Sequence, residues 1–289
     1  MALLQFPLLL NFRSSPSPGI SFTRGRDFKI RCSNERQALF NRIAPVYDNL
    51  NDLLSLGQHR VWKRMAVSWS GAKGGDTVLD ICCGSGDLAF LLSEKVGVDG
   101  QVLGLDFSRE QLLIASSRQQ ERSSACYKNI EWLQGDALNL PFPNDTFDAI
   151  TMGYGLRNVT DKERAVQEIF RVLKPGCKVS ILDFNKSNQP VTGLIQVVAL
   201  DAVINDANRR KEISRNIFII IIQEWMIDNV VVPAATVYGL ADEYKYLKSS
   251  IQEFLTGKEL EQLALAIGFS DAKFYEIAGG LMGNLVATC

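Results

Sequence analysis

Short apolar segments alternate with longer amphipathic segments from residue 77 to residue 183. The apolar segments have the length of strands, and the amphipathic ones repeat apolar residues at helical spacing. A strand, a helix and a second strand in this order form a parallel pair with a right-handed crossover. The pattern therefore predicts an α/β fold, a doubly wound, Rossmann-like sheet. The predicted strands are residues 77–81, 101–105, 130–133, 147–152 and 178–183, and the predicted helices are residues 88–95, 108–120 and 161–172.

The segments on either side of this alternation complete the predicted fold. Residues 34–43 and 53–69 precede it and have the spacing of helices, and residues 257–267 form a further predicted helix. Residues 191–255 do not follow the alternation and are predicted to be mainly helical. A hairpin near the C-terminus would place one antiparallel strand at the edge of the sheet. Its predicted strands are residues 272–277 and 284–287.

The first 32 residues differ in composition from the rest of the chain. They hold five basic residues and one acidic residue, and they are rich in Ser, Pro and Phe. This composition is typical of an organelle transit peptide. A secretory signal is the alternative, but Gln5 and Pro7 interrupt the apolar stretch and no basic residue precedes it. Because the residues before Ser33 are similar to plastid processing sites, we expect a chloroplast transit peptide at 1–32, with a mitochondrial one as the alternative. The mature domain is then 33–289.

Charge and composition exclude several classes of function. A formal net charge of -1 gives no basic field that would attract nucleic acid, so no nucleic-acid partner is expected. The six cysteines form no pair of CxxC elements and the chain has one histidine, so no metal site is predicted. No apolar run reaches the roughly 18 residues that span a bilayer. The mature protein is expected to be soluble or peripheral to a membrane.

A glycine-rich turn follows the first predicted strand. The sequence from Asp80 reads DICCGSGD and leads directly into a predicted helix. Gly84 and Gly86, on either side of Ser85, allow a ligand to approach the backbone closely, and the helix N-terminus offers free N–H groups. Twenty residues after Gly86, the second strand ends at Asp106, where a carboxylate can accept hydrogen bonds from ribose hydroxyls. The pattern predicts a nucleotide cofactor.

Two cofactors fit a glycine turn with a strand-end acid. A nicotinamide dinucleotide would place its pyrophosphate at the helix N-terminus, but Asp80 and Asp87 put negative charge on both sides of that position. S-adenosylmethionine carries a sulfonium and an ammonium, which suit carboxylates. Asp136, followed by Ala137, ends the third strand and could accept from the adenine amino group. We therefore predict S-adenosylmethionine, bound by Asp80, Gly84, Ser85, Gly86, Asp106, Asp136 and Ala137. The structural alternative is that the aspartates cap turns.

Longer segments carry a resemblance to a known family. Residues 47–62 (YDNLNDLLSLGQHRVW) resemble the N-terminal signature of the menaquinone and ubiquinone biosynthesis C-methyltransferases. Residues 171–177, together with 182–185, resemble the second signature, with Cys177 where glycine is usual and Asp183 where glutamate is usual. The sequence GLRNV from Gly155 is also similar. The likeness spans about residues 34 to 289, apart from one stretch, and implies a class I S-adenosylmethionine methyltransferase fold.

The resemblance also implies a substrate. Residues 225–233 and 279–287 are most similar to the plant and cyanobacterial branch, which methylates demethylphylloquinone in phylloquinone biosynthesis. The expected partner is a lipophilic, prenylated naphthoquinol, and the apolar residues near 225–232 could accept its tail or touch a membrane. Two alternatives stay open. One is a benzoquinol C-methyltransferase of the ubiquinone pathway, and the other is an inactive module that binds S-adenosylmethionine.

Several residues receive roles from this implied chemistry. A ring carbon attacks a sulfonium methyl group only when the ring is electron-rich, so the acceptor must be the quinol and its phenolic hydroxyl must lose a proton. Arg157 is the candidate for stabilising the oxyanion, and Asn158 for orienting the substrate or a water. His59, the only histidine, is the candidate base, with a structural role as the alternative. Tyr47 would contact the cofactor if the N-terminal helices form a lid.

One stretch does not match the family pattern. The 27 residues from Val197 to Gln223 separate two segments that the pattern would join directly. The stretch begins with valine, whose codons are GTN, and ends with isoleucines and a glutamine that pyrimidine-rich triplets ending in CAG can encode. These are the two ends of an intron. We therefore hypothesise a retained intron of 81 nucleotides that keeps the reading frame.

Overall fold

The computed structural model describes residues 57–186, residues 229, 233, 236 and 246, and residues 249–289. Four predictions lie outside these residues: the transit peptide at 1–32, the helix at 34–43, the contact by Tyr47 and the insert at 197–223.

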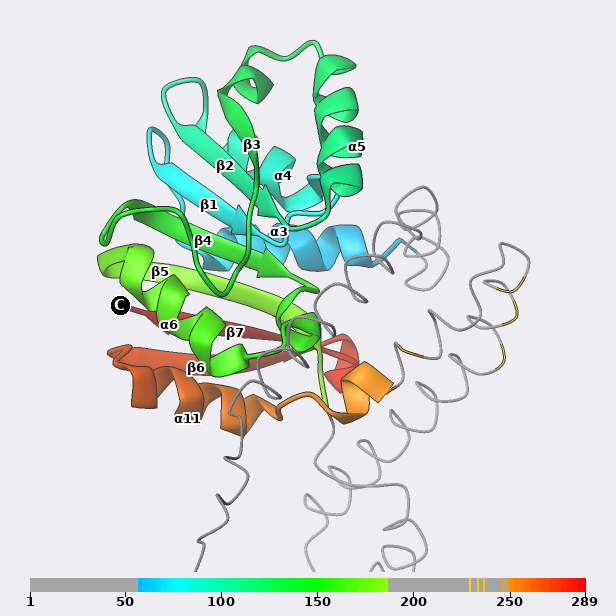
Figure 1. The fold of residues 1–289 in the computed structure, drawn as a ribbon, viewed down its shortest axis with the longest axis vertical. Coiled ribbons are helices and arrows are strands. Elements are labelled where there is room, and N and C mark those ends of the chain that lie inside the picture. Colours follow the sequence, from blue (N-terminus) through cyan, green and yellow to red (C-terminus); the bar gives the residue numbers. More distant parts are fainter. Residues whose placement is uncertain (1–56, 187–228, 230–232, 234–235, 237–245, 247–248) are drawn as a thin grey trace, which may run out of the picture.

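A seven-stranded sheet forms the centre of the described structure, in the order β3-β2-β1-β4-β5-β7-β6 (Figure 1). Six strands run parallel, and β7 is antiparallel to both of its neighbours. The order reverses between β1 and β4, and in such sheets ligands bind beyond the carboxyl ends of the strands at this reversal. The strands are β1 (Thr77–Ile81), β2 (Gln101–Asp106), β3 (Ile130–Gln134), β4 (Phe147–Gly153), β5 (Leu173–Phe184), β6 (Asp271–Ile277) and β7 (Met282–Thr288).

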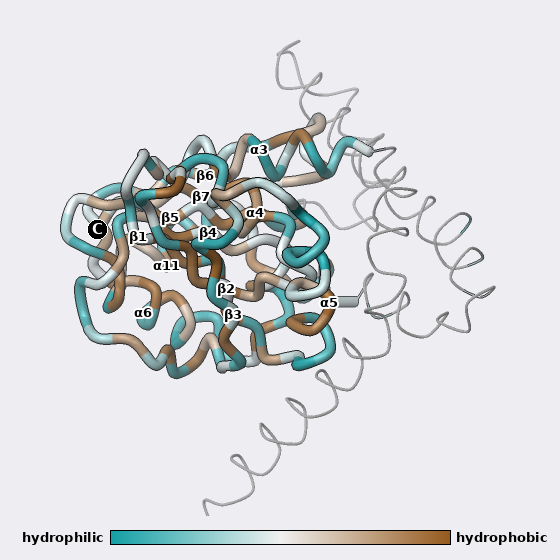
Figure 2. The backbone as a smooth tube through the Cα atoms, turned by 90° about the horizontal axis from the view of Figure 1, so that it is seen from above, coloured by the Kyte–Doolittle hydropathy of each residue, from teal (hydrophilic) through white to brown (hydrophobic). Residues whose placement is uncertain are grey.

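Helices cover both faces of the sheet. They form two hydrophobic clusters with the sheet. In one cluster, α3 and α4 pack on one face, and in the other, α6 and α11 pack on the opposite face. Figure 2 shows the central strands between α3 and α6, with hydrophobic segments running through the middle of the molecule. The helices are α3 (His59–Trp69), α4 (Asp87–Val96), α5 (Arg109–Gln120), α6 (Lys162–Val172) and α11 (Gly257–Ile267), with short 3-10 turns η1 (Ala125–Asn129), η2 (Leu156–Asn158) and η4 (Ala278–Gly280).

The structure confirms the predicted fold class. All seven predicted strands are present, and β1 and α11 have the predicted bounds. The antiparallel strand that was predicted near the sheet edge is β7. It is followed in the sheet by β6, which is the edge strand. The fifth strand begins earlier than predicted, at Leu173, because Leu173 pairs with Phe147 before an irregularity in the register.

The first turns of three helices are held by side-chain caps. Ser108 Oγ accepts from Gln111 N–H at the start of α5, and Asp161 accepts from Arg164 N–H at the start of α6. Thr256 forms a capping box with Glu259 at the start of α11. By contrast, α4 begins at Asp87, directly after the left-handed Gly86, and Gly86 makes no side-chain cap. The N-terminus of α4 is therefore fixed by the glycine turn and by groups from other elements.

Candidate active site

A cavity lies beyond the carboxyl ends of β1, β2, β3 and β4, at the point where the strand order reverses. Its wall contains the turn after β1, the end of β2 with the first turn of α5, and the turns after β3 and β4. One residue of α3 also lines it. The lining residues are 63, 82–85, 87, 88, 105–107, 111, 135–138, 153–155 and 158–160.

The turn after β1 has a conformation that requires glycine at two places. Gly84 has φ 54° and Gly86 has φ 92°, in the left-handed region that favours glycine. A Cβ on Gly86 would lie 2.6 Å from the Cη2 atom of Trp132, which is closer than real Cβ atoms approach. Of the three residues predicted here to bind the cofactor, Gly84 and Ser85 line the cavity, whereas Gly86 does not and instead packs against the β3 tryptophan.

Asp106, a predicted cofactor-binding residue, lies at the end of β2 and lines the cavity. Its Oδ2 accepts from Gly84 N–H at 2.9 Å, and its Oδ1 accepts from Ser108 N–H at 2.8 Å. Burial raises the pKa of Asp106 to about 6, although these backbone donors pull it down. A carboxylate has about four lone-pair positions. Asp106 can therefore accept further hydrogen bonds from a ligand while it holds the glycine turn against α5.

Asp80 is placed differently from the prediction. It is fully buried one residue before the end of β1, and it does not line the cavity. Asp80 is in register with Thr151 on β4, and its Oδ1 accepts from Thr151 Oγ1 at 2.8 Å. Burial raises the pKa of Asp80 to about 7. The side chain lies behind the cavity wall because the strand pairing turns it towards β4.

Asp87 is held by two cations from different helices. Its Oδ2 accepts from Lys63 Nζ of α3 at 2.6 Å, and its Oδ1 accepts from Arg118 of α5 at 2.7 Å. Arg118 also donates to the carbonyl and the hydroxyl of Ser85. Burial would raise the pKa of Asp87, but Lys63 and Arg118 together lower it well below its usual range. Lys63 and Arg118 thus compensate the negative charge of Asp87, which disfavours a pyrophosphate at this helix N-terminus. Lys63 is also the ammonium-bearing residue of the cavity wall.

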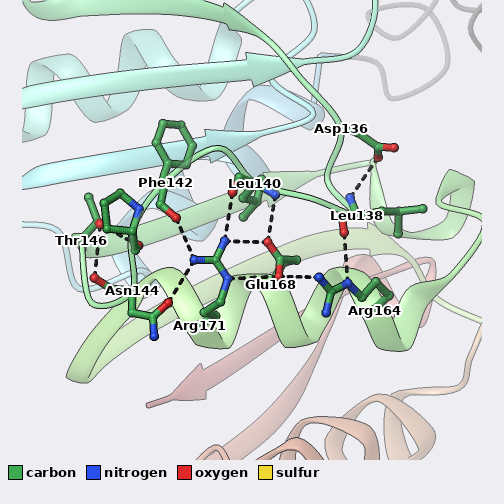
Figure 3. Close-up of polar contacts among 10 residues, drawn as sticks. Asp136, Leu138, Leu140, Phe142, Asn144, Thr146, Arg164, Glu168 and Arg171 are labelled. Carbon is green, nitrogen blue, oxygen red and sulfur yellow. Dashed lines mark hydrogen bonds and ion pairs between the residues drawn. The ribbon is translucent and has the colours of Figure 1, made fainter.

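The turn after β3 supplies Asp136 and Ala137, both on the cavity wall. Asp136 Oδ1 accepts from Leu138 N–H at 2.9 Å. Figure 3 shows how the chain that follows is fixed to α6: Arg171 donates to Glu168 and to carbonyl groups of the β3–β4 connection. Glu168 in turn accepts from Leu140 N–H at 2.9 Å. Arg171, the first residue of the second signature, therefore supports the cavity wall from outside.

The turn after β4 brings Asn158 to the cavity wall. Its Nδ2 donates to the Tyr154 carbonyl at 3.0 Å, and its Oδ1 accepts from the hydroxyl of Tyr246 at 3.3 Å. Tyr154 itself has φ 58°, a left-handed conformation that is rare for a non-glycine residue. Such backbone strain is common at functional sites. Both atoms of the Asn158 amide are oriented by the protein at this end of the cavity.

Arg157 points away from the cavity, in contrast to Asn158. Its NH1 donates to Asp183 Oδ1 at 2.7 Å, and its backbone N–H donates to Asp183 Oδ2 at 3.1 Å. Both side chains are buried, and the guanidinium lies over the ring of Phe184. The structure thus joins the GLRNV segment to the acid of the second signature in one ion pair behind the wall.

The remaining predicted residue, His59, begins α3 and is buried. It does not line the cavity, whereas Lys63, one helical turn later, does. Three further residues at the site were not predicted from the sequence: Lys63, Arg118 and Gln111. Lys63 directly follows the N-terminal signature, and this position could have identified it. No motif marks Arg118 or Gln111, which both lie in α5.

The described residues contain neither a candidate metal site nor a membrane-spanning helix. Within the described part of the chain, no group of three or more His, Cys, Asp or Glu side chains could hold a metal ion. None of the helices described there is long and apolar enough to cross a membrane.

Comparison with known sequences identifies similar proteins. The profile of the ubiE/COQ5 methyltransferase family matches residues 30–197. A relative from Arabidopsis thaliana, named 2-phytyl-1,4-beta-naphthoquinone methyltransferase, chloroplastic, is 64% identical over 258 residues, which cover 89% of this chain and 88% of the relative. A relative from Nostoc sp., named 2-phytyl-1,4-naphtoquinone methyltransferase, is 47% identical over 254 residues, which cover 88% of this chain and 98% of the relative.

Solved structures share the fold at low sequence identity. An S-adenosylmethionine-dependent methyltransferase from Aquifex aeolicus superposes with a TM-score of 0.53 and 18% identity, over 83% of this chain and 96% of that one. A protein from Methanococcus maripaludis, described as a putative S-adenosylmethionine-dependent methyltransferase, gives 0.53 and 20% identity, over 86% of this chain and 92% of that one. These similarities concern the fold.

Proposed function

The chain belongs to the ubiE/COQ5 methyltransferase family, and we propose that it transfers a methyl group from S-adenosylmethionine to a ring carbon of a prenylated naphthoquinol. The relatives at 64% and 47% identity, which are named as naphthoquinone methyltransferases, support the substrate. The step belongs to phylloquinone synthesis. The chloroplast is the expected compartment, in keeping with the name of the Arabidopsis relative and with the composition of residues 1–32.

One observation carries the proposal. A single continuous cavity at the strand-order reversal is lined at one part by Gly84, Asp106 and Asp136 and at another by Asn158. The first set offers an uncovered backbone turn and carboxylates, which suit the hydroxyl and amino donors of adenosine. The second set is a polar group that can contact an acceptor molecule. Donor and acceptor can therefore meet within one enclosure.

The described residues fit S-adenosylmethionine. Gly84 leaves room for the ligand beside the turn, and Asp106 has spare lone pairs for the ribose. Lys63 provides a cation on the wall, which we assign to the carboxylate of the methionine part. When it is bound, S-adenosylmethionine supplies an electrophilic methyl group on a sulfonium.

The residues after β4 are assigned to the acceptor. We assign the contact with the quinol to Asn158, because this residue lines the cavity and both its Nδ2 and its Oδ1 are held by hydrogen bonds. Arg157 is assigned a positioning role, because its guanidinium is paired with Asp183 behind the wall and holds η2 in place. His59 is assigned to holding α3, and so Lys63, against the sheet. Residues 225–232, which could accept the tail or touch a membrane, lie outside the described residues except for Asn229.

The ring must be reduced for the reaction to proceed. A sulfonium methyl group is an electrophile, and a quinone ring is electron-poor. Loss of a phenolic proton from the quinol raises the electron density at the ring carbon, and hydrogen bonding to the resulting oxyanion favours that state. We assign this hydrogen bond to Asn158 Nδ2, which donates to the Tyr154 carbonyl in the structure and would donate to the oxyanion in the complex.

A turnover assay tests the proposal. Labelled S-adenosylmethionine is mixed with demethylphylloquinone, either chemically reduced or left oxidised, and the protein begins at Ser33. We expect label in the lipid product with the quinol only. Tight binding of S-adenosylmethionine without turnover on this acceptor or on a ubiquinone-type benzoquinol would instead favour the inactive binding module. Turnover on the benzoquinol alone would favour the ubiquinone pathway.

The same assay also compares protein with and without the predicted insert. The family match ends at residue 197, the first residue of the predicted insert. We propose that protein lacking residues 197–223 is the active form. Sequencing the transcript is the independent test, because uniform presence of these 27 codons in mature message would contradict a retained intron.

A further inference from the structure

Gln111 is a buried polar residue on the cavity wall that the roles assigned above do not use. It lies in the first turn of α5 and is 3% exposed. Among the described residues, its side-chain oxygen has no hydrogen-bond partner. Buried polar atoms in folded proteins nearly always have a partner, so an unpartnered oxygen on a cavity wall indicates that a ligand supplies the missing donor.

The backbone of Gln111 is fixed by the groups around it. Gln111 N–H donates to Ser108 Oγ at 3.2 Å, and Ser108 N–H donates to Asp106 at 2.8 Å, so the first turn of α5 is tied to the end of β2. A Cβ built on Gly84 would lie 3.8 Å from Gln111 Oε1. The oxygen therefore lies directly beside the glycine turn, at van der Waals distance from the place of a Gly84 side chain. Asp106, Gly84 and Gln111 thus form one cluster around the same part of the cavity.

We infer that the Gln111 amide oxygen accepts a hydrogen bond from the adenosine part of the methyl donor. This inference rests on the proposed function, since it names a contact within that site. Adenosine has two ribose hydroxyls and one amino group as donors, and Asp106 and Asp136 offer further acceptors on the same wall. A pyrophosphate or another anion has no donor to offer this oxygen. Gln111 therefore contributes to the choice of an adenosine ligand as well as to affinity.

The test compares Gln111→Met with wild type. Methionine has a similar length and keeps the apolar contacts, but it lacks the hydrogen-bonding oxygen. Gln120→Met is the matched control, because Gln120 is exposed at the other end of the same helix. Affinity for S-adenosylhomocysteine is measured by calorimetry. We expect about three- to tenfold weaker binding for Gln111→Met, the range that a neutral hydrogen bond supplies, and no change for Gln120→Met.

Modified ligands identify which donor is used. The 2′-deoxy, 3′-deoxy and N6,N6-dimethyl forms of S-adenosylhomocysteine each remove donors from one position. We expect wild type to bind at least one of them several-fold more weakly than the parent compound, and we expect that ratio to shrink in Gln111→Met. Asp106 and Asp136 still act in the variant, so a residual penalty is expected.

The melting temperature of the unliganded variant separates this reading from a structural role. Removing a buried side-chain oxygen that has no partner should leave the melting temperature unchanged or raise it. Gln111→Leu is the second variant if the methionine variant does not fold. Equal affinity of the Gln111 variants and wild type for S-adenosylhomocysteine, or unchanged ratios for all three modified ligands, would overturn the inference. Failure of wild type itself to bind S-adenosylhomocysteine would instead contradict the proposed function.

Discussion

Arg157 and Asp183 form a buried ion pair with 2.7 Å between NH1 and Oδ1, and it links the turn after β4 to the end of β5. Asp183 also accepts from the backbone N–H groups of Arg157 and Phe184. Three hydrogen bonds and one countercharge thus converge on a single carboxylate. The pair holds η2 so that Asn158, the next residue, faces the cavity.

Removing the carboxylate should leave a buried positive charge without its partner. For Asp183→Ala we expect a loss of about 3–5 kcal/mol in the free energy of unfolding, as is typical when one member of a buried pair is removed. Asp183→Glu, which restores the residue that is usual in the family, is the control and should lose far less. Urea denaturation of both variants measures the difference, and equal stability of Asp183→Ala and wild type would show that the pair is dispensable.

Asp106→Asn should weaken cofactor binding more than it weakens the fold. The amide keeps the shape but loses the charge and part of the acceptor capacity that Gly84, Ser108 and the ligand share. Hydrogen bonds to charged groups contribute about 1.5–3 kcal/mol, so we expect S-adenosylmethionine affinity to fall at least tenfold. Calorimetry measures it, and circular dichroism of the variant shows whether the fold is kept. Unchanged affinity would place the ribose elsewhere.

The contribution of Asp80 and Asp106 to the stability of the unliganded protein should fall as the pH rises from about 4 to about 7. Burial raises the pKa of Asp80 to about 7 and that of Asp106 to about 6, whereas the pKa of an aspartate in the unfolded chain is about 4. At a pH above about 4 and below these raised pKa values, both carboxyl groups are therefore protonated in the folded state and ionised in the unfolded state. Stability from these groups is therefore greatest at low pH. For Asp80, the charge of Asp106 adds to the rise and that of Lys63 opposes it.

Asp80→Asn isolates this effect. It removes a buried charge but keeps an oxygen that can accept from Thr151. We expect the variant to gain stability over wild type at pH 8, by about 1 kcal/mol for each unit of the pKa shift, and the gain to fade towards pH 4. Unfolding curves across this pH range measure the difference. A constant difference at all pH values would mean that Asp80 does not titrate as described.

Gly86→Ala should disrupt the turn after β1. A Cβ there would lie 2.6 Å from Trp132, in a backbone conformation of φ 92°. Gly97→Ala is the matched control, because Gly97 has φ 73° but nothing within 4 Å of the added atom. The control should lose about 1–3 kcal/mol of stability, because φ 73° with ψ -170° is a backbone conformation that alanine rarely adopts. Gly86→Ala should lose more stability and also bind S-adenosylmethionine more weakly, measured by denaturation and calorimetry.

Lys63→Met should reduce affinity for S-adenosylmethionine about tenfold, the contribution of one charged hydrogen bond. The change removes the cation assigned to the methionine carboxylate and leaves Asp87 with Arg118 alone. Lys95→Met, an exposed lysine in the last turn of α4, is the control and should bind like wild type. Equal losses in both variants, measured by calorimetry, would point to a general charge effect.

The fold could be predicted from the sequence because its signals are local. The switch from helical spacing to short apolar runs marks each strand, and the order of elements then restricts the sheet to a few arrangements. The start of β5 was missed because Pro175 and Gly176 have the appearance of a turn. In the structure, Leu173 nevertheless pairs with Phe147, and the register shifts before the regular pairing resumes at Lys178.

The site could be predicted where a side chain's place follows from the end of its own strand or turn. Asp106, Asp136 and Asn158 are of this kind. Asp80 and Arg157 have partners 71 and 26 residues away in the chain, Thr151 and Asp183, and these pairings turn them away from the cavity. Contacts of that kind depend on strand register and on packing between elements, which residue spacing does not encode.

The position of the transferred methyl group distinguishes ring-carbon chemistry from methylation of oxygen. S-adenosylmethionine with a 13C-labelled methyl group is incubated with reduced demethylphylloquinone, and the extracted product is examined by NMR. We expect one labelled resonance at the chemical shift of a methyl group on a ring carbon. A labelled resonance at the shift of a methoxy group would show methylation of oxygen, and it would contradict the assignment of this site to ring-carbon chemistry.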